Sequence, residues 1–255
     1  MRIGLKRTNI GHTSMFVSCY YDIYQKPERA KEYFAWFDDL GKSGLPIVLF
    51  TDPAQTHLFH KFPITVHTVG VPLQGFELYR MGMAFQGELP GNRTVEKDTK
   101  EFFSLMNTKM EFVKKAKELF PDVLKFMWID FGILKIAKNR DRCIKKLRQI
   151  QETTFKKVTI PGCWAYGRSF SVNAIHWRFC GGFFVMPVQH VDRFFEHSKG
   201  VLRDFCTMPQ YRLTWETNVW TVIETCAEKE NIDWYFADHN DTMIMNIDLV
   251  EKASC

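Results

Sequence analysis

Residues 126–132 form an apolar run that carries one carboxylate to its end and then turns at a glycine. The stretch from Phe126 to Ile129 has the composition of a buried strand, Asp130 follows it directly, and Gly132 comes two residues later. A single charge at the end of a buried strand costs free energy unless it has a partner or a use. The run therefore predicts a central strand with a functional group at its carboxyl end.

The segment from Ile47 to Pro53 has the same form, with an apolar strand that ends in Asp52. In open α/β sheets ligands bind beyond the carboxyl ends of the strands, so Asp52 and Asp130 are expected to share one site. The alternative is that each aspartate only caps the turn or helix that follows it, and the Asp-Pro pair at 52–53 favours that alternative for Asp52.

The first fifty residues indicate the fold class. An apolar strand pattern at 14–21 is followed by helical spacing of aromatic residues at 26–40 and by the strand at 47–50. This β-α-β opening predicts a parallel α/β sheet. At 255 residues with 45% hydrophobic content, the chain can bury a full core, and one domain spanning 1–255 is expected.

The rest of the chain alternates between helical and strand patterns in the same way. Strands are predicted at 64–69, 178–186 and 234–236. Helices are predicted at 95–120, 141–153, 191–206 and 216–229.

The charge balance bears on the class of partner. A formal charge of +5, from 34 basic and 29 acidic residues, is compatible with a phosphate-bearing ligand but far from a nucleic-acid-binding signature. The densest basic stretch, 135–157, is interpreted as the solvated face of a helix. No nucleic-acid partner is expected.

The seven cysteines form no CxxC pair, so neither a zinc knuckle nor a disulfide framework is indicated. Reduced thiols predict a cytoplasmic location. No apolar run approaches the roughly 20 residues of a membrane span, so no transmembrane segment is expected. The abundance of aromatic residues makes a homodimer compatible with the sequence.

Three further features are candidates for chemistry. Glu216 begins an aromatic-rich helix, where the helix dipole favours the charged form that a base or nucleophile needs; an ordinary helix-start glutamate is the alternative. The paired Gly181 and Gly182 indicate a bulge or a close approach of ligand to backbone, or else tight packing. The loop 238–241, Asp-His-Asn-Asp, offers ligands for a divalent metal or a pyrophosphate, or is a solvated turn.

Two enzyme classes are disfavoured because their motifs are missing from the sequence. There is no GxSxG motif of a serine hydrolase and no GxxxxGK[ST] phosphate loop.

Six short motifs, taken in order and spacing, are similar to those of a known group. They are VSCYYDI at 17–23, VLFTD at 48–52, SLMNTKMEFV at 104–113, WIDFGI at 128–133, CGGFF at 180–184 and WETNVW at 215–220. Together they resemble the HtrL/YibB-type proteins, a glycosyltransferase-like group, and more distantly the GT-A nucleotide-sugar transferases. The resemblance covers about residues 14–245. It implies a single GT-A-like α/β domain with a mixed, mainly parallel central sheet flanked by helices.

The resemblance also implies roles for single residues. It places Asp52 near the base or ribose of a nucleotide sugar, and Asn107 and Lys109 on a helix that faces the donor. Glu216 takes the position of a base, nucleophile or acceptor-binding acid, and is the expected catalytic residue. The stereochemical outcome, inversion or retention, stays open. Gly181 and Gly182 line the acceptor side and are counted with the ligand-binding residues.

A divalent metal, Mn²⁺ or Mg²⁺, is the cofactor that the resemblance implies, with Asp130 in the DxD-like element and His239 as the C-terminal ligand. The motif is incomplete, because either Gly132 or Trp128 stands where a second acid is usual. Metal dependence therefore stays open, and Lys109 with nearby arginines is the alternative means of neutralising the leaving group.

The expected reaction is transfer of a hexosyl or pentosyl group from a nucleotide diphosphate donor, with UDP as the expected nucleotide, to a hydroxyl of a glycan or related acceptor. The alternative is a catalytically inactive nucleotide- or carbohydrate-binding protein with the same fold, which the missing acid favours.

Overall fold

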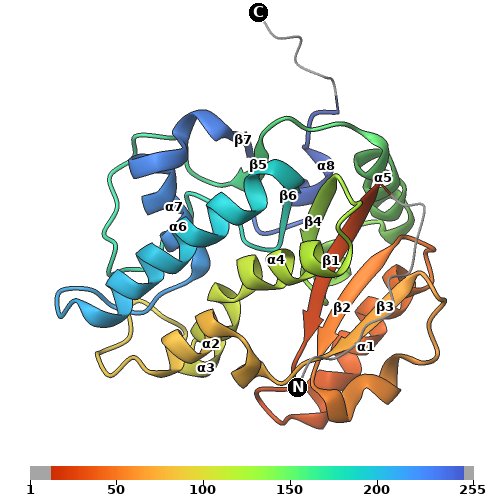
Figure 1. Ribbon diagram of the computed structural model, residues 1–255, viewed down its shortest axis with the longest axis horizontal. Helices are drawn as coiled ribbons and strands as arrows, with labels where there is room; N and C mark the ends of the chain where they lie inside the picture. The colour runs from red at the N-terminus through yellow and green to blue at the C-terminus, as the bar shows by residue number, and fades with distance from the viewer. Residues whose placement is uncertain (1–12, 250–255) are drawn as a thin grey trace, which may run out of the picture.

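The computed structural model describes residues 13–249, built around one seven-stranded sheet with helices on both faces (Figure 1). The strands are β1 (Ser14–Tyr20), β2 (Ile47–Thr51), β3 (Val66–Gly70), β4 (Lys125–Ile129), β5 (Val158–Gly162), β6 (Phe183–Pro187) and β7 (Ile232–Phe236). Their order across the sheet is β3-β2-β1-β4-β6-β5-β7.

The sheet is mixed and mainly parallel, as predicted. Strand β6 is antiparallel to both its neighbours, β4 and β5, whereas the remaining pairs are parallel. Because of this reversal, the amino end of β6 lies at the same edge as the carboxyl ends of the other strands. The segment that leads into β6 therefore meets the loops that follow β1, β4, β5 and β7.

Two apolar cores cover the two faces, because alternate residues of each strand point in opposite directions. Val17 and Trp128 belong to the core under α2 (Glu77–Met83), α3 (Lys100–Asn107), α4 (Lys109–Leu119), α6 (Val188–Thr207) and α7 (Glu216–Ile223). Phe16 and Met127 belong to the core under α1 (Pro27–Gly41), α5 (Arg140–Glu152) and α8 (Thr242–Met245).

The predicted helix at 95–120 is wrong as one element, since the chain forms α3 and α4 with a break at Thr108. Its backbone N–H donates to Leu105 O in a tightened turn, and its hydroxyl donates to Ser104 O. A hydroxyl that bonds back into the preceding turn commonly bends a helix. The break directs α4 so that its first residue, Lys109, lies beneath the carboxyl edge of the sheet.

The strand predicted at 178–186 is also shorter than expected. Residues 178–182 form a loop, and β6 begins only at Phe183. Strand β5 was not predicted at all, because Pro161 and Gly162 at its end read as loop residues. The predicted helix at 216–229 is α7 followed by a π-helical turn, Glu224–Glu228.

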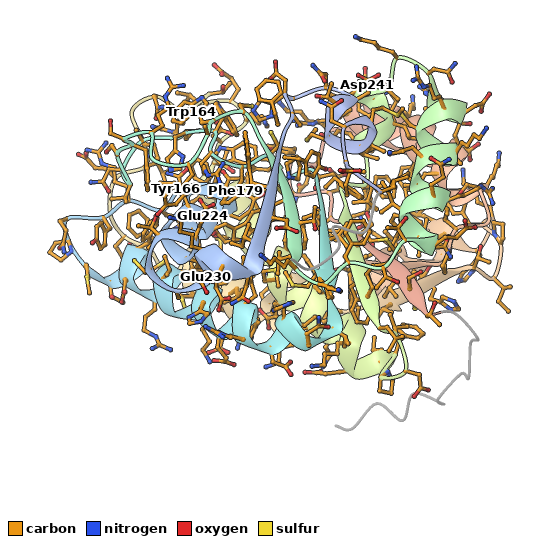
Figure 2. All side chains as sticks on the ribbon, turned by 90° about the horizontal axis from the view of Figure 1, so that it is seen from above. Trp164, Tyr166, Phe179, Glu224, Glu230 and Asp241 are labelled. Atoms are coloured by element: carbon orange, nitrogen blue, oxygen red, sulfur yellow. The ribbon has the colours of Figure 1, made fainter. Side chains whose placement is uncertain are left out.

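The long loop between β5 and β6 is anchored to that turn by a buried ion pair. The Arg178 Nε donates to a Glu224 carboxylate oxygen at 2.8 Å, and both side chains are at most 6% exposed. The guanidinium also lies 4.8 Å from the centre of the Phe179 ring. Figure 2 labels Phe179 and Glu224 beside Trp164 and Tyr166 of the same loop. This anchor fixes the stretch of loop that reaches the functional edge.

Across residues 13–249, none of the helices combines the length and the apolar character that crossing a bilayer requires.

Candidate functional site

A pocket of about 500 Å³ opens at the carboxyl edge of the sheet, beyond β1 and β4. This is where ligands bind in open α/β sheets. The aromatic residues of its wall are Tyr20, Tyr21, Tyr24, Tyr33, Phe102, Trp128, Phe131, Trp177 and Trp215. Its charged or imidazole side chains are Asp22, Arg29, Lys97, Lys109, Asp130, Lys135 and His239. Gly181 and Gly182 complete one side of the pocket.

Asp130 is held at the pocket by two donors. Trp128 Nε1 donates to Asp130 Oδ1 at 2.7 Å, and Lys109 Nζ lies 3.0 Å from the same oxygen. The carboxylate remains 39% exposed, and no described residue donates to Oδ2. The predicted strand-end aspartate is therefore fixed in position and keeps one oxygen to accept a hydrogen bond from a ligand.

Lys109 is the centre of a buried charge network. Its ammonium is 1% exposed and contacts Glu216 Oε1 at 2.7 Å, Gly181 O at 2.8 Å and Asp130 Oδ1 at 3.0 Å. An ammonium has three donors, so these three acceptors satisfy it completely. Burial alone would lower the pKa of Lys109, but the charges of Asp130 and Glu216 outweigh it and raise that pKa. Lys109 is therefore a fixed and almost fully buried cation in the pocket wall.

Glu216 is the first residue of α7 and is 2% exposed. One oxygen contacts Lys109, whereas Oε2 is buried without a hydrogen-bond partner. Burial raises the pKa of Glu216, and the Lys109 ammonium opposes that rise. The side chain is not among those that line the pocket and lies behind Lys109 and Gly181. This geometry supports a role in positioning Lys109, while the predicted role as base or nucleophile stays a prediction.

Gly181 is required by the close approach of Glu216. A Cβ at position 181 would lie 1.9 Å from Glu216 Oε1 and 3.2 Å from Lys109 Nζ. Gly182 is less tightly packed: a Cβ there would lie 3.1 Å from Ile133 Cδ1, closer than an ordinary van der Waals contact but against a side chain alone. The Gly182 carbonyl accepts from the Asp130 N–H. The sequence left two explanations open for the glycine pair, a close approach of ligand to backbone and tight packing. Both glycines line the pocket, as the first explanation requires, and Gly181 is tightly packed, as the second requires.

Lys97 and Lys135 are cations of the pocket wall that sequence reasoning did not single out. Neither makes an ion pair among the described residues, and each ammonium instead lies over aromatic rings: Lys97 is 4.5 Å from the Trp215 ring centre and Lys135 is 5.4 Å from that of Trp36. Burial lowers the pKa of Lys97, the charge of Asp98 opposes this, the Lys135 charge lowers the pKa further, and Asp130 again opposes. Because neither lysine is held in an ion pair with a described residue, both ammonium groups are free to contact an anionic ligand.

The sequence contained only weak signals for these lysines. Lys135 was assigned to a solvated basic face, and Lys97 fell inside a predicted helix that in fact begins at Lys100. Trp215 belongs to the WETNVW motif, but nothing in the motif shows that its ring would lie beneath a lysine.

Besides Glu216, two more of the predicted residues, Asp52 and Asn107, do not line the pocket. Asp52 accepts a hydrogen bond from the Ala54 N–H at 2.9 Å and caps the short helix Pro53–Phe59, which is the capping alternative stated above. Asn107 is buried and donates to the carbonyls of Phe103 and Thr214, joining α3 to the start of α7. Contact of either residue with a nucleotide stays a prediction.

The donors around Asp130 do not fit the Mn²⁺ or Mg²⁺ site that was expected from Asp130 and His239. Asp130 Oδ1 is already bound by a buried ammonium, whose charge would repel a dication on the same carboxylate. In residues 13–249, the one group of three or more metal-ligating side chains within reach of each other is Cys163, Cys180 and His239, and Asp130 is outside it.

No family model matches the chain, and no curated protein matches it, so the resemblance to the HtrL/YibB-type proteins stays a prediction. Among solved structures, the chain is similar to the mannosyltransferase Ktr4p from S. cerevisiae, with 9% identity over 88% of this chain and 69% of that one and a TM-score of 0.49.

Two further structures are similar. A glycosyltransferase involved in the glycosylation of the major capsid of PBCV-1 is 14% identical over 88% of this chain and 82% of that one, with a TM-score of 0.41. The 4-diphosphocytidyl-2C-methyl-D-erythritol synthase from Anaerococcus prevotii is 8% identical over 90% of each chain, with a TM-score of 0.44. At these scores the similarity says nothing on substrate or reaction, for which the geometry of the pocket is the guide.

Proposed function

We propose that the protein is a nucleotide-sugar-dependent glycosyltransferase. It transfers a hexosyl or pentosyl group from a nucleoside diphosphate sugar, with a UDP-sugar as the first donor to test, to a hydroxyl of a glycan or related acceptor. The observation that carries this proposal is the pairing of Lys97 and Lys135 with the fixed carboxylate of Asp130 in one aromatic-walled pocket.

Each part of the pocket suits one part of such a donor. The two lysines suit the diphosphate, whose charge grows as the sugar departs; fixed cations stabilise that charge without the cost of reorganising solvent. The aromatic rings suit a nucleobase or a sugar face. Asp130 Oδ2 suits a sugar hydroxyl, which donates to a carboxylate.

The buried network supports Asp130 from behind. Lys109 holds the orientation of the Asp130 carboxylate, and Glu216 in turn holds Lys109. In this proposal Glu216 is a positioning residue, which acts through Lys109. Direct removal of the acceptor proton by Glu216 would require a path past Gly181, which separates it from the pocket.

The test is an assay of nucleoside diphosphate release from a panel of nucleotide sugars, each with and without a mixture of glycan acceptors. Release that depends on one donor and is lost in Asp130→Asn supports the transferase. Saturable binding of a nucleotide sugar without release under any acceptor condition would instead support the inactive binding protein.

The same panel run with chelator, and then with added Mn²⁺ or Mg²⁺, tests the expected cofactor. The network at Asp130 predicts that neither cation restores or raises the rate. A transfer rate that requires Mn²⁺ would instead support a metal ion bound at Asp130.

The six cysteines of residues 13–249 are free, which supports the proposal of a reducing compartment such as the cytoplasm.

A further inference from the structure

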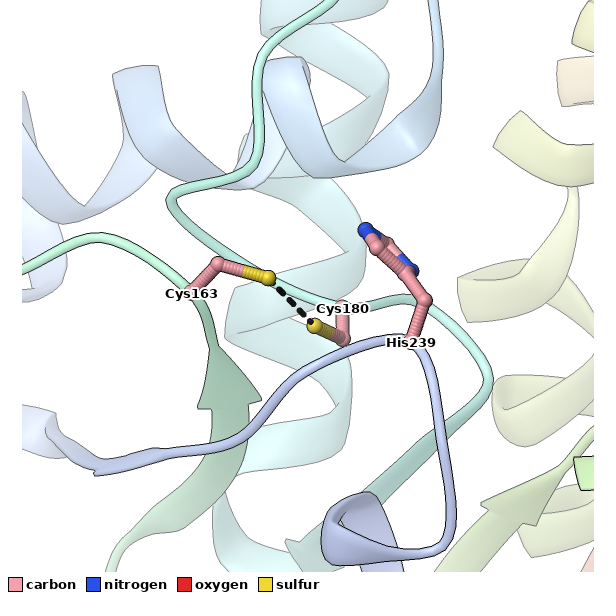
Figure 3. Close-up of side chains that lie close together, drawn as sticks. All are labelled: Cys163, Cys180 and His239. Carbon is pink, nitrogen blue, oxygen red and sulfur yellow. Dashed lines mark hydrogen bonds between the residues drawn. The ribbon is translucent and has the colours of Figure 1, made fainter.

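Cys163, Cys180 and His239 lie together at the carboxyl edge of the sheet, although they are far apart in the sequence (Figure 3). Cys163 directly follows β5, Cys180 stands just before β6, and His239 follows β7. The reversal of β6 brings these three ends to one edge. Backbone bonds hold them there, because the Cys180 N–H donates to Pro161 O at 2.7 Å and the Ala237 N–H donates to Gly162 O at 3.0 Å.

The spacing of the side-chain donors fits a tetrahedral metal. The two sulfurs are 3.6 Å apart, and the sulfur and imidazole ligand atoms of all three residues lie within 4.8 Å of one another. With zinc–sulfur bonds of about 2.3 Å, the edge of a tetrahedron is about 3.8 Å. The thiols are therefore already separated by the distance that two ligands of one zinc ion require.

The chemistry of the donors selects the metal. Two thiolates and an imidazole suit zinc, whereas Mn²⁺ and Mg²⁺ prefer oxygen ligands. The Cys163 thiol donates to Asp238 Oδ1 at 3.7 Å, but Asp238 is outside the group of three ligands, which leaves the fourth position of the metal open. Cys180 is fully buried, but Cys163 is only partly buried and His239 is exposed, so an ion has a path of entry from solvent.

We propose that Cys163, Cys180 and His239 form a zinc site with an open fourth position. Binding replaces two thiol protons, which pass to solvent, and changes no oxidation state. It also fixes one wall of the main pocket, because the His239 ring packs edge-on against Trp177 with centres 4.2 Å apart and both residues line that pocket. The site is independent of the transferase proposal and is tested by its own spectrum.

The experiment uses the full-length protein under reducing conditions, freed of metal by chelator, and titrated with Co²⁺ as a spectroscopic substitute. The expected result is one tetrahedral cobalt per chain, with thiolate-to-cobalt charge-transfer bands and displacement by one equivalent of Zn²⁺. Cys163→Ser and His239→Asn should each weaken zinc binding by at least about tenfold.

Cys226→Ser is the matched control, since Cys226 is an exposed thiol outside the cluster, and it should leave the titration unchanged. Cys180 lies in the core, so Cys163→Ser is the deciding variant if Cys180→Ser fails to fold. A cobalt spectrum without thiolate bands, or zinc binding that Cys163→Ser leaves unchanged, would overturn the proposal.

Peptide mapping distinguishes the redox alternative. A disulfide requires the sulfurs to approach from 3.6 Å to about 2.05 Å and requires an oxidant. A Cys163–Cys180 disulfide that persists in reduced protein would contradict the zinc site, whereas two free thiols that become protected from alkylation by Zn²⁺ would support it.

Discussion

Lys109 Nζ lies 2.7 Å from Glu216 Oε1, and the two side chains are 1% and 2% exposed. Such a buried pair adds little to stability, because the cost of removing two charges from water is close to what their attraction returns. Removing one partner of the pair lowers stability strongly, since it leaves the other charge buried without a counter-charge. With Asp130 on the same ammonium, the pair is better explained as a device that fixes the orientation of a pocket carboxylate.

Lys109→Met should lower the free energy of unfolding by about 3 to 5 kcal/mol, because it leaves Glu216 buried without a counter-charge. Chemical denaturation at neutral pH measures the change. The control is Lys115→Met, which removes an exposed ion pair with Glu118 and should cost no more than about 1 kcal/mol. Equal effects of the two substitutions would contradict a buried network.

Glu216→Gln keeps an acceptor oxygen for Lys109 but removes the charge. Donor affinity should stay within about twofold of the wild type, while turnover falls by about a hundredfold or more, in the range that a misplaced catalytic group costs. Separate measurements of the donor Kd and of kcat test whether turnover falls while donor affinity is kept. An unchanged kcat would contradict both roles of Glu216, as the catalytic residue and as the residue that positions Lys109.

Gly181→Ala places a Cβ against Glu216 Oε1 and must displace the network. We expect a loss of about 1 to 3 kcal/mol of stability from this overpacking, together with a loss of turnover. Gly200→Ala in α6 is the matched control, because a Cβ there meets nothing within 4 Å and an alanine in a helix should be neutral or stabilising by up to about 1 kcal/mol. A fully active Gly181→Ala protein would show that the close packing is not needed.

His176 should make the stability depend on pH. Its ring is buried, neither nitrogen has a hydrogen-bond partner, and burial lowers its pKa from 6.5 to about 4. The folded state binds the proton less tightly than the unfolded state, so the contribution to stability is present above pH 6.5 and is lost as the pH falls toward 4.

The size of this effect should be on the order of 2 to 3 kcal/mol between pH 7 and pH 4. His176→Phe keeps an aromatic ring beside Phe170, at 4.3 Å in the native protein, and should flatten the curve relative to wild type. His57→Phe, at an exposed position, should leave the curve unchanged. Parallel curves for His176→Phe and wild type would show that the histidine is not the titrating group.

The elements with strong periodic patterns were predictable. The strands at β1, β2 and β7 and the helices α1, α5 and α6 lie within a few residues of their predicted positions. All of them except the partly buried β7 bury one face or are buried throughout. The elements that were predicted wrongly or missed have local causes. The hydroxyl of Thr108 divides a continuous apolar stripe into α3 and α4, and Pro161 and Gly162 gave β5 the pattern of a loop.

The site was predictable only where a residue is tied to a strand end. Asp130 and the glycine pair follow from the strand pattern, and the structure places them at the pocket. Contacts across the sequence were not predictable: nothing in the residues around Lys109 shows that Glu216, 107 positions later, would meet it. The Cys163–Cys180 pair was also not predictable from the cysteine spacing. A CxxC motif detects cysteines that are close in sequence, whereas these two come together because they lie at the ends of neighbouring strands.

The central claim is that Lys97 and Lys135 bind the diphosphate of a nucleotide sugar, and thermal unfolding with a panel of nucleoside diphosphates tests it most directly, because a ligand of the folded state alone raises the Tm. We predict that one nucleotide family raises the Tm, that chelator leaves the shift intact, and that Lys97→Gln and Lys135→Gln each weaken binding by about tenfold, the loss of a charge-assisted contact.

The matched control is Lys31→Gln, which removes a cation at an exposed pair with Glu28 and should leave the nucleotide shift unchanged. A nucleotide-dependent shift that survives both Lys97→Gln and Lys135→Gln, or the lack of a shift with every nucleoside diphosphate, would contradict the claim.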